Sequence, residues 1–191
     1  FTLKKLYIEE LQSAIEKREL NFEELTLDIQ DEAMVKTINL ALNNDDESQQ
    51  VLALEMIKEI PLTPWKDSLN KLLNDGSIIV KKEILNISYD DENIISDQKI
   101  ISLINNESDL EIESIEIAGK RKLTDALPII KDRINAENKE KQLIAAAAIR
   151  NIDPDSSNNE KNLLLSAFNS NDENICSLII KQMKNLNYLV V

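Results

Sequence analysis

The residues that most often perform catalysis or hold metals are scarce in this chain. Histidine is absent, and Cys176 is the single cysteine. Without histidine the chain cannot build a Ser-His-Asp or Cys-His triad or the usual zinc sites. Two glycines are too few for the glycine-rich loops that bind phosphate groups. We therefore predict that the chain is not an enzyme and carries no metal or other cofactor.

Carboxylates are plentiful, but their spacing favours solvated turns and helix faces. They gather at Asp45–Glu47, at Asp90–Glu92 and at Glu107, Asp109, Glu111 and Glu113. A calcium loop would need alternating Asp or Asn, a central Gly and a final Glu, and none of these stretches matches. Cys176 lies inside a helical pattern, which favours a buried or half-buried filler over a nucleophile.

Two features could contact a partner, and each has a structural alternative. Trp65 could be a binding hot spot or a base-stacking platform, although a packed position is favoured. The one concentrated basic patch is Lys120-Arg121-Lys122, with Lys131 and Arg133 following. Because Gly119 is expected to end a helix there, cations that complement the helix dipole are favoured over cations that bind an acidic partner. The candidate partner contacts are Trp65, Lys120, Arg121 and Lys122.

Composition and charge predict an all-α protein that does not bind nucleic acid. The chain has 191 residues, of which 42% are apolar and 4% aromatic, with two Gly and four Pro. Its net charge of −13 would repel nucleic acid and anionic membranes. No apolar run reaches the ~20 residues that span a bilayer, so we expect no direct membrane insertion by this segment. The chain begins at Phe1 rather than Met, which suggests a segment excised from a longer protein. With a single cysteine and no signal peptide, we expect a cytoplasmic location.

An apolar residue followed by Asn recurs along the chain at intervals of 31, 31, 30 and 34 residues. The pairs are Leu42-Asn43, Leu73-Asn74, Ile104-Asn105, Ile134-Asn135 and Phe168-Asn169. Asn tolerates the left-handed conformation that ends a helix, and the Asp, Asn or Ser that follow can cap the next helix. Each stretch therefore predicts the turn inside a helical hairpin.

A second marker follows each turn by about ten residues, near the middle of the second helix. The first residue of each pair is usually small and the second usually larger and apolar, as stacked helices require. The pairs are Ala53-Leu54, Ile84-Leu85, Ser114-Ile115, Ala145-Ala146 and Ser177-Leu178.

The two markers predict a repeat array of about five hairpins. Residues 1–30 form an N-terminal capping helix, at Leu3–Arg18, and a linker; one continuous domain of repeats follows over 31–191. The repeats are expected at about 31–60, 61–93, 94–122, 123–153 and 154–191. Their first helices are expected to begin at Asp31 or Glu32, at Thr63 with Pro64, at Ser96, at Thr124 with Pro128 in the first turn, and at Ser156–Asn159.

The hairpins resemble HEAT-like repeats of the short bacterial type over about residues 31–187. Val80-Lys81-Lys82-Glu83-Ile84-Leu85 is similar to their usual Val-Arg-x-x-Ala-Leu, with Lys in place of Arg and Ile in place of Ala. The resemblance implies a right-handed α-solenoid. Tetratricopeptide and ankyrin signatures are absent.

A narrower resemblance rests on Leu20–Leu25, Leu27–Asp31, Val51–Ile57 and Ala118–Lys122. These segments resemble the HEAT region of bacterial membrane proteins that join a nucleotide-translocase-like transporter half to cytosolic repeats. This resemblance implies that the native chain is fused to a membrane transporter domain.

Together these observations predict a non-catalytic protein-interaction or regulatory scaffold whose acidic helical-repeat surface binds a protein partner through its second helices. One alternative is the cytosolic regulatory region of a nucleotide (ATP/ADP) transporter-like membrane protein. Another is an enzyme of the HEAT-like superfamily, a DNA glycosylase or a bilin lyase.

Overall fold

The computed structural model is helical throughout the part of the chain that it describes. That part comprises Ser13 and residues 31–89, 91–156, 158–170 and 172–185. No strand occurs among these residues, which confirms the predicted all-α fold class. Apart from Ser13, the predicted capping helix and linker over 1–30 lie outside the described residues. None of the described helices combines the length and the apolar character needed to cross a membrane.

The described residues form successive pairs of helices. Two pairs, α2 (Glu32–Leu42) with α3 (Glu47–Ile57) and α4 (Lys66–Asp75) with α5 (Ile78–Ile87), belong to a compact unit that ends at Ile95. A second unit begins at Ser96. Its pairs are α6 (Asp97–Asn106) with α7 (Glu111–Lys120), α8 (Leu127–Arg133) with α9 (Lys139–Ile152), and α10 (Asn158–Phe168) with α11 (Glu173–Asn185). Two 3-10 turns, η2 (Thr63–Trp65) and η3 (Thr124–Ala126), precede α4 and α8. We call the two parts unit 1 and unit 2.

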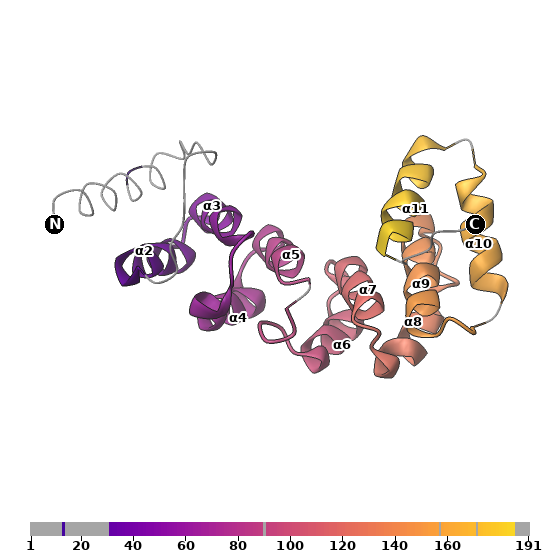
Figure 1. The fold of residues 1–191 in the computed structure, drawn as a ribbon, viewed down its shortest axis with the longest axis horizontal. Coiled ribbons are helices and arrows are strands. Elements are labelled where there is room, and N and C mark those ends of the chain that lie inside the picture. Colours follow the sequence, from indigo (N-terminus) through magenta and orange to yellow (C-terminus); the bar gives the residue numbers. More distant parts are fainter. Residues whose placement is uncertain (1–12, 14–30, 90, 157, 171, 186–191) are drawn as a thin grey trace. The chain divides into compact units, whose positions relative to one another are not determined.

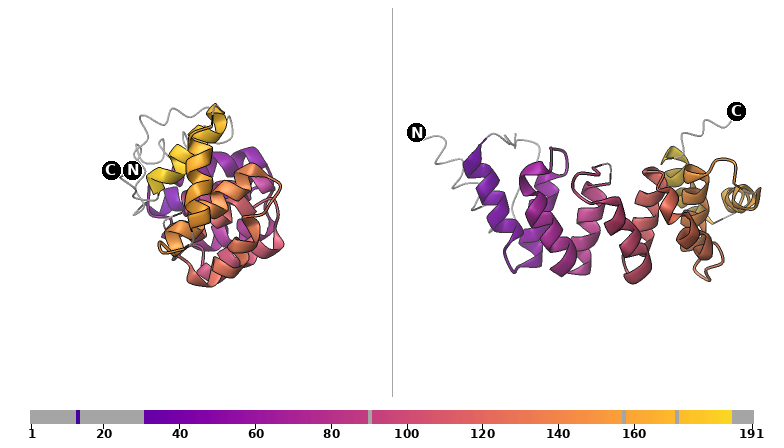
Figure 2. Two further views of the ribbon diagram at one scale, coloured as in Figure 1. Left: turned by 90° about the vertical axis from the view of Figure 1, so that its right-hand side faces the viewer. Right: turned by 90° about the horizontal axis from the view of Figure 1, so that it is seen from below.

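The described helices of unit 1 lie in two layers (Figures 1 and 2). Helix α2 contacts α4, and α3 contacts α5, so the first helices of the two pairs lie side by side and so do the second helices. The core between the layers contains Leu42, Leu54, Leu73 and Leu85, all fully buried. This layering follows from helices that each carry one apolar stripe and bury it against a neighbour.

Helix α9 is the centre of unit 2. It contacts α7, α8, α10 and α11, and Figure 1 shows these helices grouped around it. Four consecutive residues, Ala145–Ala148, are buried together with Ile144 and Ile149. A helix that is apolar on all sides belongs in a core rather than at a surface. The alanines also leave room for neighbouring helices to approach closely.

Short polar side chains begin most of the described helices, as the sequence predicts. Each accepts a hydrogen bond from a backbone N–H in the first turn, which no helical carbonyl can satisfy. The capping residues are Asp31, Asp46, Ser77, Ser96, Asn138 and Asp172. Four of these six lie in the predicted turns, so the first turn of each following helix is fixed by local sequence.

Thr63 and Thr124 are exceptions, because neither side chain caps a helix. Each residue instead begins a 3-10 turn, and the α-helix starts only after it, at Lys66 and at Leu127. The 3-10 turn places Trp65 inside the core, where its backbone N–H donates to the Leu62 carbonyl at 3.0 Å. The two α-helices therefore begin three residues later than the expected starts at Thr63 and Thr124.

The Asn residues of the turns end their helices in a different way from the predicted one. None of those described has a positive φ; Asn43, for example, has φ −94°. Its side-chain amide donates to the Asn39 carbonyl at 2.8 Å and to the Ser68 hydroxyl at 2.9 Å. The Asn39 carbonyl, which also accepts the Asn43 backbone N–H at 3.1 Å, thus receives a second hydrogen bond, and the side chain links the end of α2 to α4.

A single register relates the second helices of all described pairs. The tenth residue after each turn Asn is Ala53, Ile84, Ile115, Ala145 or Ile179, and each is at most 1% exposed. In the last pair the predicted marker was Ser177-Leu178, but Ser177 is exposed and Leu178 only half-buried. The buried position of each second helix therefore lies at a fixed distance of ten residues from the turn Asn. The predicted pairs, which were chosen by a small-then-large pattern, began up to two residues before it.

Gly119 marks a close approach between α7 and α9. A Cβ built on Gly119 would lie 2.8 Å from both the Cα and the Cβ of Ala148, shorter than any normal contact. Gly119 lies inside α7, which continues to Lys120, so the expectation that this glycine ends the helix is wrong. Its role is to let two backbones come together.

We predict that Gly119→Ala destabilises the protein by about 1–3 kcal/mol, because the added methyl group overpacks the contact with Ala148. In a helix without this contact the same change would stabilise by about 1 kcal/mol. Urea unfolding followed by circular dichroism measures the difference. Ser102→Ala, at an exposed position of α6, is the control and should change stability by less than about 0.5 kcal/mol. A higher midpoint for Gly119→Ala would contradict the close approach.

Candidate functional site

Trp65 belongs to the core of unit 1. Its side chain is fully buried, and its indole Nε1 donates to the Val35 carbonyl of α2 at 3.2 Å. The hydrogen bond satisfies the one polar atom of the ring, as buried tryptophan requires. Trp65 therefore takes the packed position that the sequence analysis weighed against a partner contact, and it presents no surface to a ligand.

Arg121 is also used inside the protein. Its side chain is 3% exposed, and Nη1 lies 3.3 Å from Oδ1 of Asp97, the first residue of α6. A carboxylate at the start of α6 is favourable for the dipole of that helix, and the guanidinium neutralises it. The contact joins the end of α7 to the start of α6. Arg121 is thus a structural residue of unit 2, which corrects its place among the candidate partner contacts.

Lys122 follows the C-cap of α7 and has a left-handed backbone conformation, which glycine adopts more easily than lysine does. The Leu123 N–H donates to the Ala118 carbonyl at 2.9 Å, and the Lys122 N–H donates to the Gly119 carbonyl at 3.2 Å. These two bonds form a Schellman motif, in which the residue after the helix cap is left-handed. Lys122 has φ 55°, the one positive φ among the described residues other than glycine.

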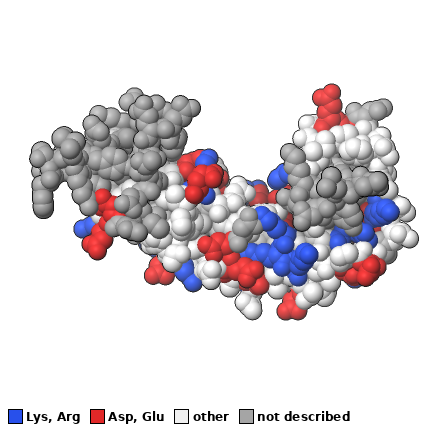
Figure 3. All heavy atoms as spheres, in the orientation of Figure 1, with Lys and Arg blue, Asp and Glu red and all other residues white. Residues whose placement is uncertain are grey.

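The three residues of the basic patch therefore differ in exposure. The Arg121 side chain is buried, Lys120 is half-buried and Lys122 is exposed. Lys131, on α8, is exposed as well. Figure 3 shows Lys and Arg atoms gathered on one face of unit 2, over α6 and α7.

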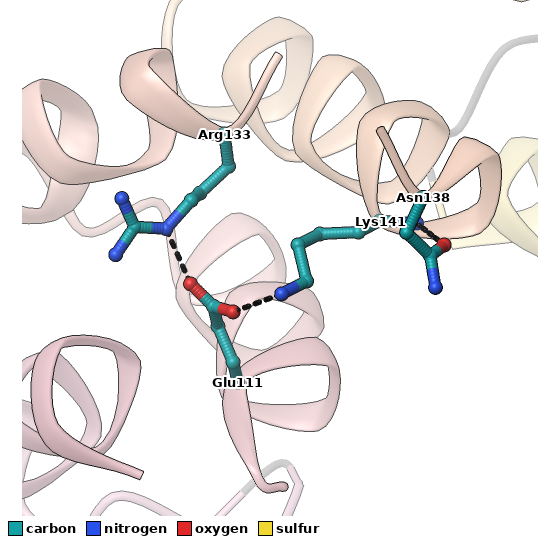
Figure 4. Close-up of polar contacts among 4 residues, drawn as sticks. All are labelled: Glu111, Arg133, Asn138 and Lys141. Carbon is teal, nitrogen blue, oxygen red and sulfur yellow. Dashed lines mark hydrogen bonds and ion pairs between the residues drawn. The ribbon is translucent and has the colours of Figure 1, made fainter. Parts of the chain in front are cut away.

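Glu111 is the centre of a polar cluster that the sequence analysis placed in solvent. It is the first residue of α7 and is 4% exposed. The Arg133 Nε, from the last turn of α8, donates to Glu111 Oε1. The Lys141 Nζ, from the first turn of α9, donates to Glu111 Oε2 at 2.5 Å. Figure 4 shows the two cations reaching the carboxylate from opposite sides. One buried carboxylate thus joins three helices.

Local structure explains why each member of this cluster is held in place. The residue before α7 is Leu110, which offers no side-chain cap, so the charge of Glu111 complements the open N-terminus of that helix. The Asn138 side chain accepts from the Lys141 N–H at 3.0 Å, which fixes the first turn of α9 from which Lys141 extends (Figure 4). The start of α7 therefore positions Glu111, and the Asn138 cap of α9 positions Lys141.

Burial alone would raise the pKa of Glu111, because it disfavours the charged form. Hydrogen bonds from Lys141 and Arg133, and their positive charges, outweigh burial and hold the pKa of Glu111 below its ordinary value of 4.5. The carboxylate is therefore ionised at neutral pH. Ionised and fully paired, it serves to hold helices together and is not arranged to accept a proton from a substrate.

The spacing of the cluster offers a signal that the sequence analysis missed. Lys141 follows Glu111 by 30 residues, which is one repeat period. The same separation joins the Trp65 ring to Val35. Complementary groups one period apart in a repeat array fall on neighbouring pairs, so a search for Glu and Lys at that spacing would have found this contact.

Cys176 and the other acidic stretches have structural roles. The thiol of Cys176 is half-buried and donates to the carbonyls of Phe168 and Ser170 at 3.4 and 3.3 Å, as a packed cysteine would. Asp46 caps α3, and Asp91 accepts from the Asn93 N–H at 2.9 Å. In the described residues no group of three or more Cys, Asp or Glu is placed to hold a metal ion.

We predict that Glu111→Gln lowers stability at pH 7 by about 2 kcal/mol, because it leaves two half-buried cations without a counter-charge. A lowered pKa gives stability that is present above the ordinary pKa of 4.5 and is lost as pH falls through the folded-state value. The difference in unfolding free energy between the unaltered protein and Glu111→Gln should therefore be largest at pH 6–7 and should shrink below about pH 4.5. Chemical unfolding across this range measures it.

Asp109→Asn, in the exposed turn two residues earlier, is the matched control and should change stability by less than about 0.5 kcal/mol at any of these pH values. A Glu111→Gln difference that is independent of pH would show that the carboxylate is not the charged partner described above.

Comparisons of the chain with protein-family models, with characterised proteins and with solved structures gave no match. The resemblance to HEAT-like repeats and to the repeat region of transporter-like membrane proteins therefore stays a prediction that rests on the residues named in the sequence analysis.

Proposed function

We propose that the chain is a non-catalytic protein-interaction module built from HEAT-like repeats. The proposal is supported by the contacts that the polar side chains make inside the protein. Those that could perform chemistry or recognition, including Trp65, Glu111 and Arg121, are engaged in contacts between helices. What the described surface offers instead is a set of charged side chains carried by helices.

We further propose that the helix pairs stack in one direction, as a right-handed α-solenoid. Two observations support it. The turn-to-core register is common to all described pairs, and in each unit the second helices contact one another in sequence, α3 with α5 and α7 with α9. Repeat proteins bury their core by such neighbour contacts.

Small-angle X-ray scattering tests the stacking. A compact globule of 191 residues would have a radius of gyration of roughly 16 Å. We expect a clearly larger value for the intact chain, with a distance distribution skewed to long vectors. A symmetric distribution and a radius near the compact value would contradict the solenoid.

The partner proposed for unit 2 is an acidic protein segment, and one observation carries this part of the proposal. Arg121 is fixed by Asp97, and the Schellman motif fixes the backbone of the next residue, so Lys122 extends from a rigid helix end. Its left-handed conformation costs about 1–2 kcal/mol relative to glycine. Because the backbone at Lys122 is already fixed, an anionic ligand that binds its exposed ammonium group does not have to order the backbone there.

We predict that Lys122→Gly raises stability and weakens binding at the same time. Glycine removes the left-handed strain, so unfolding should cost about 1 kcal/mol more. The affinity for a ten-residue glutamate peptide is measured by isothermal titration at low salt. In the double variant Lys122→Gly with Lys120→Ala it should fall about five-fold, since one exposed and one half-buried ion pair at the surface contribute about 1 kcal/mol together. Added salt should weaken binding by the unaltered chain.

The matched control removes two exposed lysines from unit 1, as Lys36→Ala with Lys66→Ala. It changes the net charge equally but should leave the affinity unaltered. Equal loss in both double variants would show a general charge effect, and no binding by the unaltered chain would end the proposal of an acidic partner.

A further inference from the structure

Helices α10 and α11 are packed on unit 2 with few buried apolar side chains. Among their described side chains, Ala167 and Ile179 are the fully buried apolar ones, and both lie in a small cluster with Leu143 of α9. Four further apolar side chains of the pair pack against this cluster but are only partly buried: Leu163, Leu164, Ile175 and Leu178. By contrast α9 buries Leu143, Ile152 and every residue from Ile144 to Ile149. Hydrophobic burial supplies most of the stability of a helix in a protein, so the last pair has much less of it than its neighbour.

The contact face of this pair is instead partly polar. Glu160 of α10 and Gln182 of α11 are buried. The Gln182 Nε2 donates to Oε1 of Glu116, on α7, at 2.5 Å, and the Lys181 Nζ lies 3.3 Å from both carboxylate oxygens of Glu116. The Glu116 side chain is 9% exposed and Gln182 is buried, so their hydrogen bond is largely removed from water, whereas the Lys181 side chain is 64% exposed. The Glu116 carboxylate of α7 therefore binds two adjacent side chains of α11.

The outward faces of the pair carry apolar side chains that nothing in the described structure covers. Leu165 and Phe168 on α10 are each 45% exposed, and Ile180 on α11 is 48% exposed. Phe168 is the apolar residue before a turn Asn. The matching residues Leu42, Leu73 and Ile104 are buried, and Ile134 of the preceding pair is half-buried. Phe168 is therefore more exposed than its counterpart in each earlier pair.

The connection from α9 defines where the weakly packed part begins. The Ser156 N–H donates to the Asp153 carbonyl at 3.0 Å, and Arg150 Nη1, from the last turn of α9, donates to the Ser156 carbonyl at 3.3 Å. These bonds fix the chain to α9 as far as Ser156. Beyond it, the pair is held by its small cluster and by the contact with Glu116.

We infer that α10 and α11 form a releasable pair, which opens from unit 2 while α7, α8 and α9 stay folded, and that Glu116 controls the opening. Local opening is expected where few apolar contacts are buried. Once released, two short helices with so small a shared core lose their helical structure. Release uncovers Leu143 and the neighbouring apolar face of α9. This inference is independent of the proposed acidic partner.

Hydrogen–deuterium exchange of the intact chain, read by mass spectrometry, tests the inference. In the unaltered protein, amides of α10 and α11 should exchange at least about 10-fold faster than those of α9. Glu116→Ala should speed exchange in α10 and α11 about a further 10-fold, because it leaves the buried Gln182 amide without its acceptor and removes the counter-charge of the exposed Lys181. Exchange in α9 should not change. Glu116→Gln keeps an acceptor for Gln182 and should have a smaller effect, and it serves if the alanine variant folds poorly.

Glu111→Ala is the matched control, since it removes a carboxylate from the same helix whose partners are on α8 and α9. It should speed exchange in those helices more than in α10 and α11. The inference is overturned if α9 exchanges as fast as α11 in the unaltered chain, if Glu116→Ala speeds both to the same extent, or if it leaves α10 and α11 unchanged.

Discussion

The close approach of α7 and α9 at Gly119 and Ala148 is the constraint on which unit 2 depends. With backbones this near, the helices cannot slide or rotate without a clash, so the side chains that they carry are fixed in relation to one another. At the start of the two helices the approach brings Glu111 within reach of Lys141. At the end of α7 it leads directly into the turn that holds Arg121 and Lys122. The polar contacts of unit 2 are therefore consequences of apolar packing as much as causes of stability.

Polar contacts between neighbouring pairs recur at nearly one repeat period. Trp65 reaches Val35, Ser68 donates to the Asn39 side chain at 2.9 Å, and Lys141 reaches Glu111, over separations of 29 or 30 residues. In each case the two groups lie on adjacent helix pairs. A chain of this kind can join its pairs with very different chemistry (an indole, a hydroxyl, an ammonium group), because the period alone brings the groups together. Directional bonds at these junctions specify the register that apolar stacking leaves less well defined.

Much of the local structure was predictable from the sequence, because its causes are local. The caps at Asp31 and Ser96 depend on one side chain and the next three residues, and the helical character follows from composition and period. The candidate site was less predictable. Lys122 occupies a conformation that its residue type disfavours, and only the hydrogen bonds of the surrounding turn reveal it. Glu111 is one acidic residue among several in its stretch, and its burial depends on cations from two later helices. Trp65 shows the remaining difficulty. A tryptophan at a binding hot spot and a tryptophan in a core are the same residue type, and they differ only in what surrounds them.

The run of four buried alanines in α9 sets unequal limits on sequence change. Any larger side chain at Ala145–Ala148 must push apart helices that already touch, and any smaller one leaves glycine in the middle of a helix. Neither an increase nor a decrease in side-chain size is therefore neutral at these four positions. On α10 and α11, where few side chains are enclosed, many replacements leave the packing as it is. Over evolutionary time purifying selection should therefore weigh most heavily on the fourteen residues of α9, while the exposed positions of α10 and α11 are left to diversify.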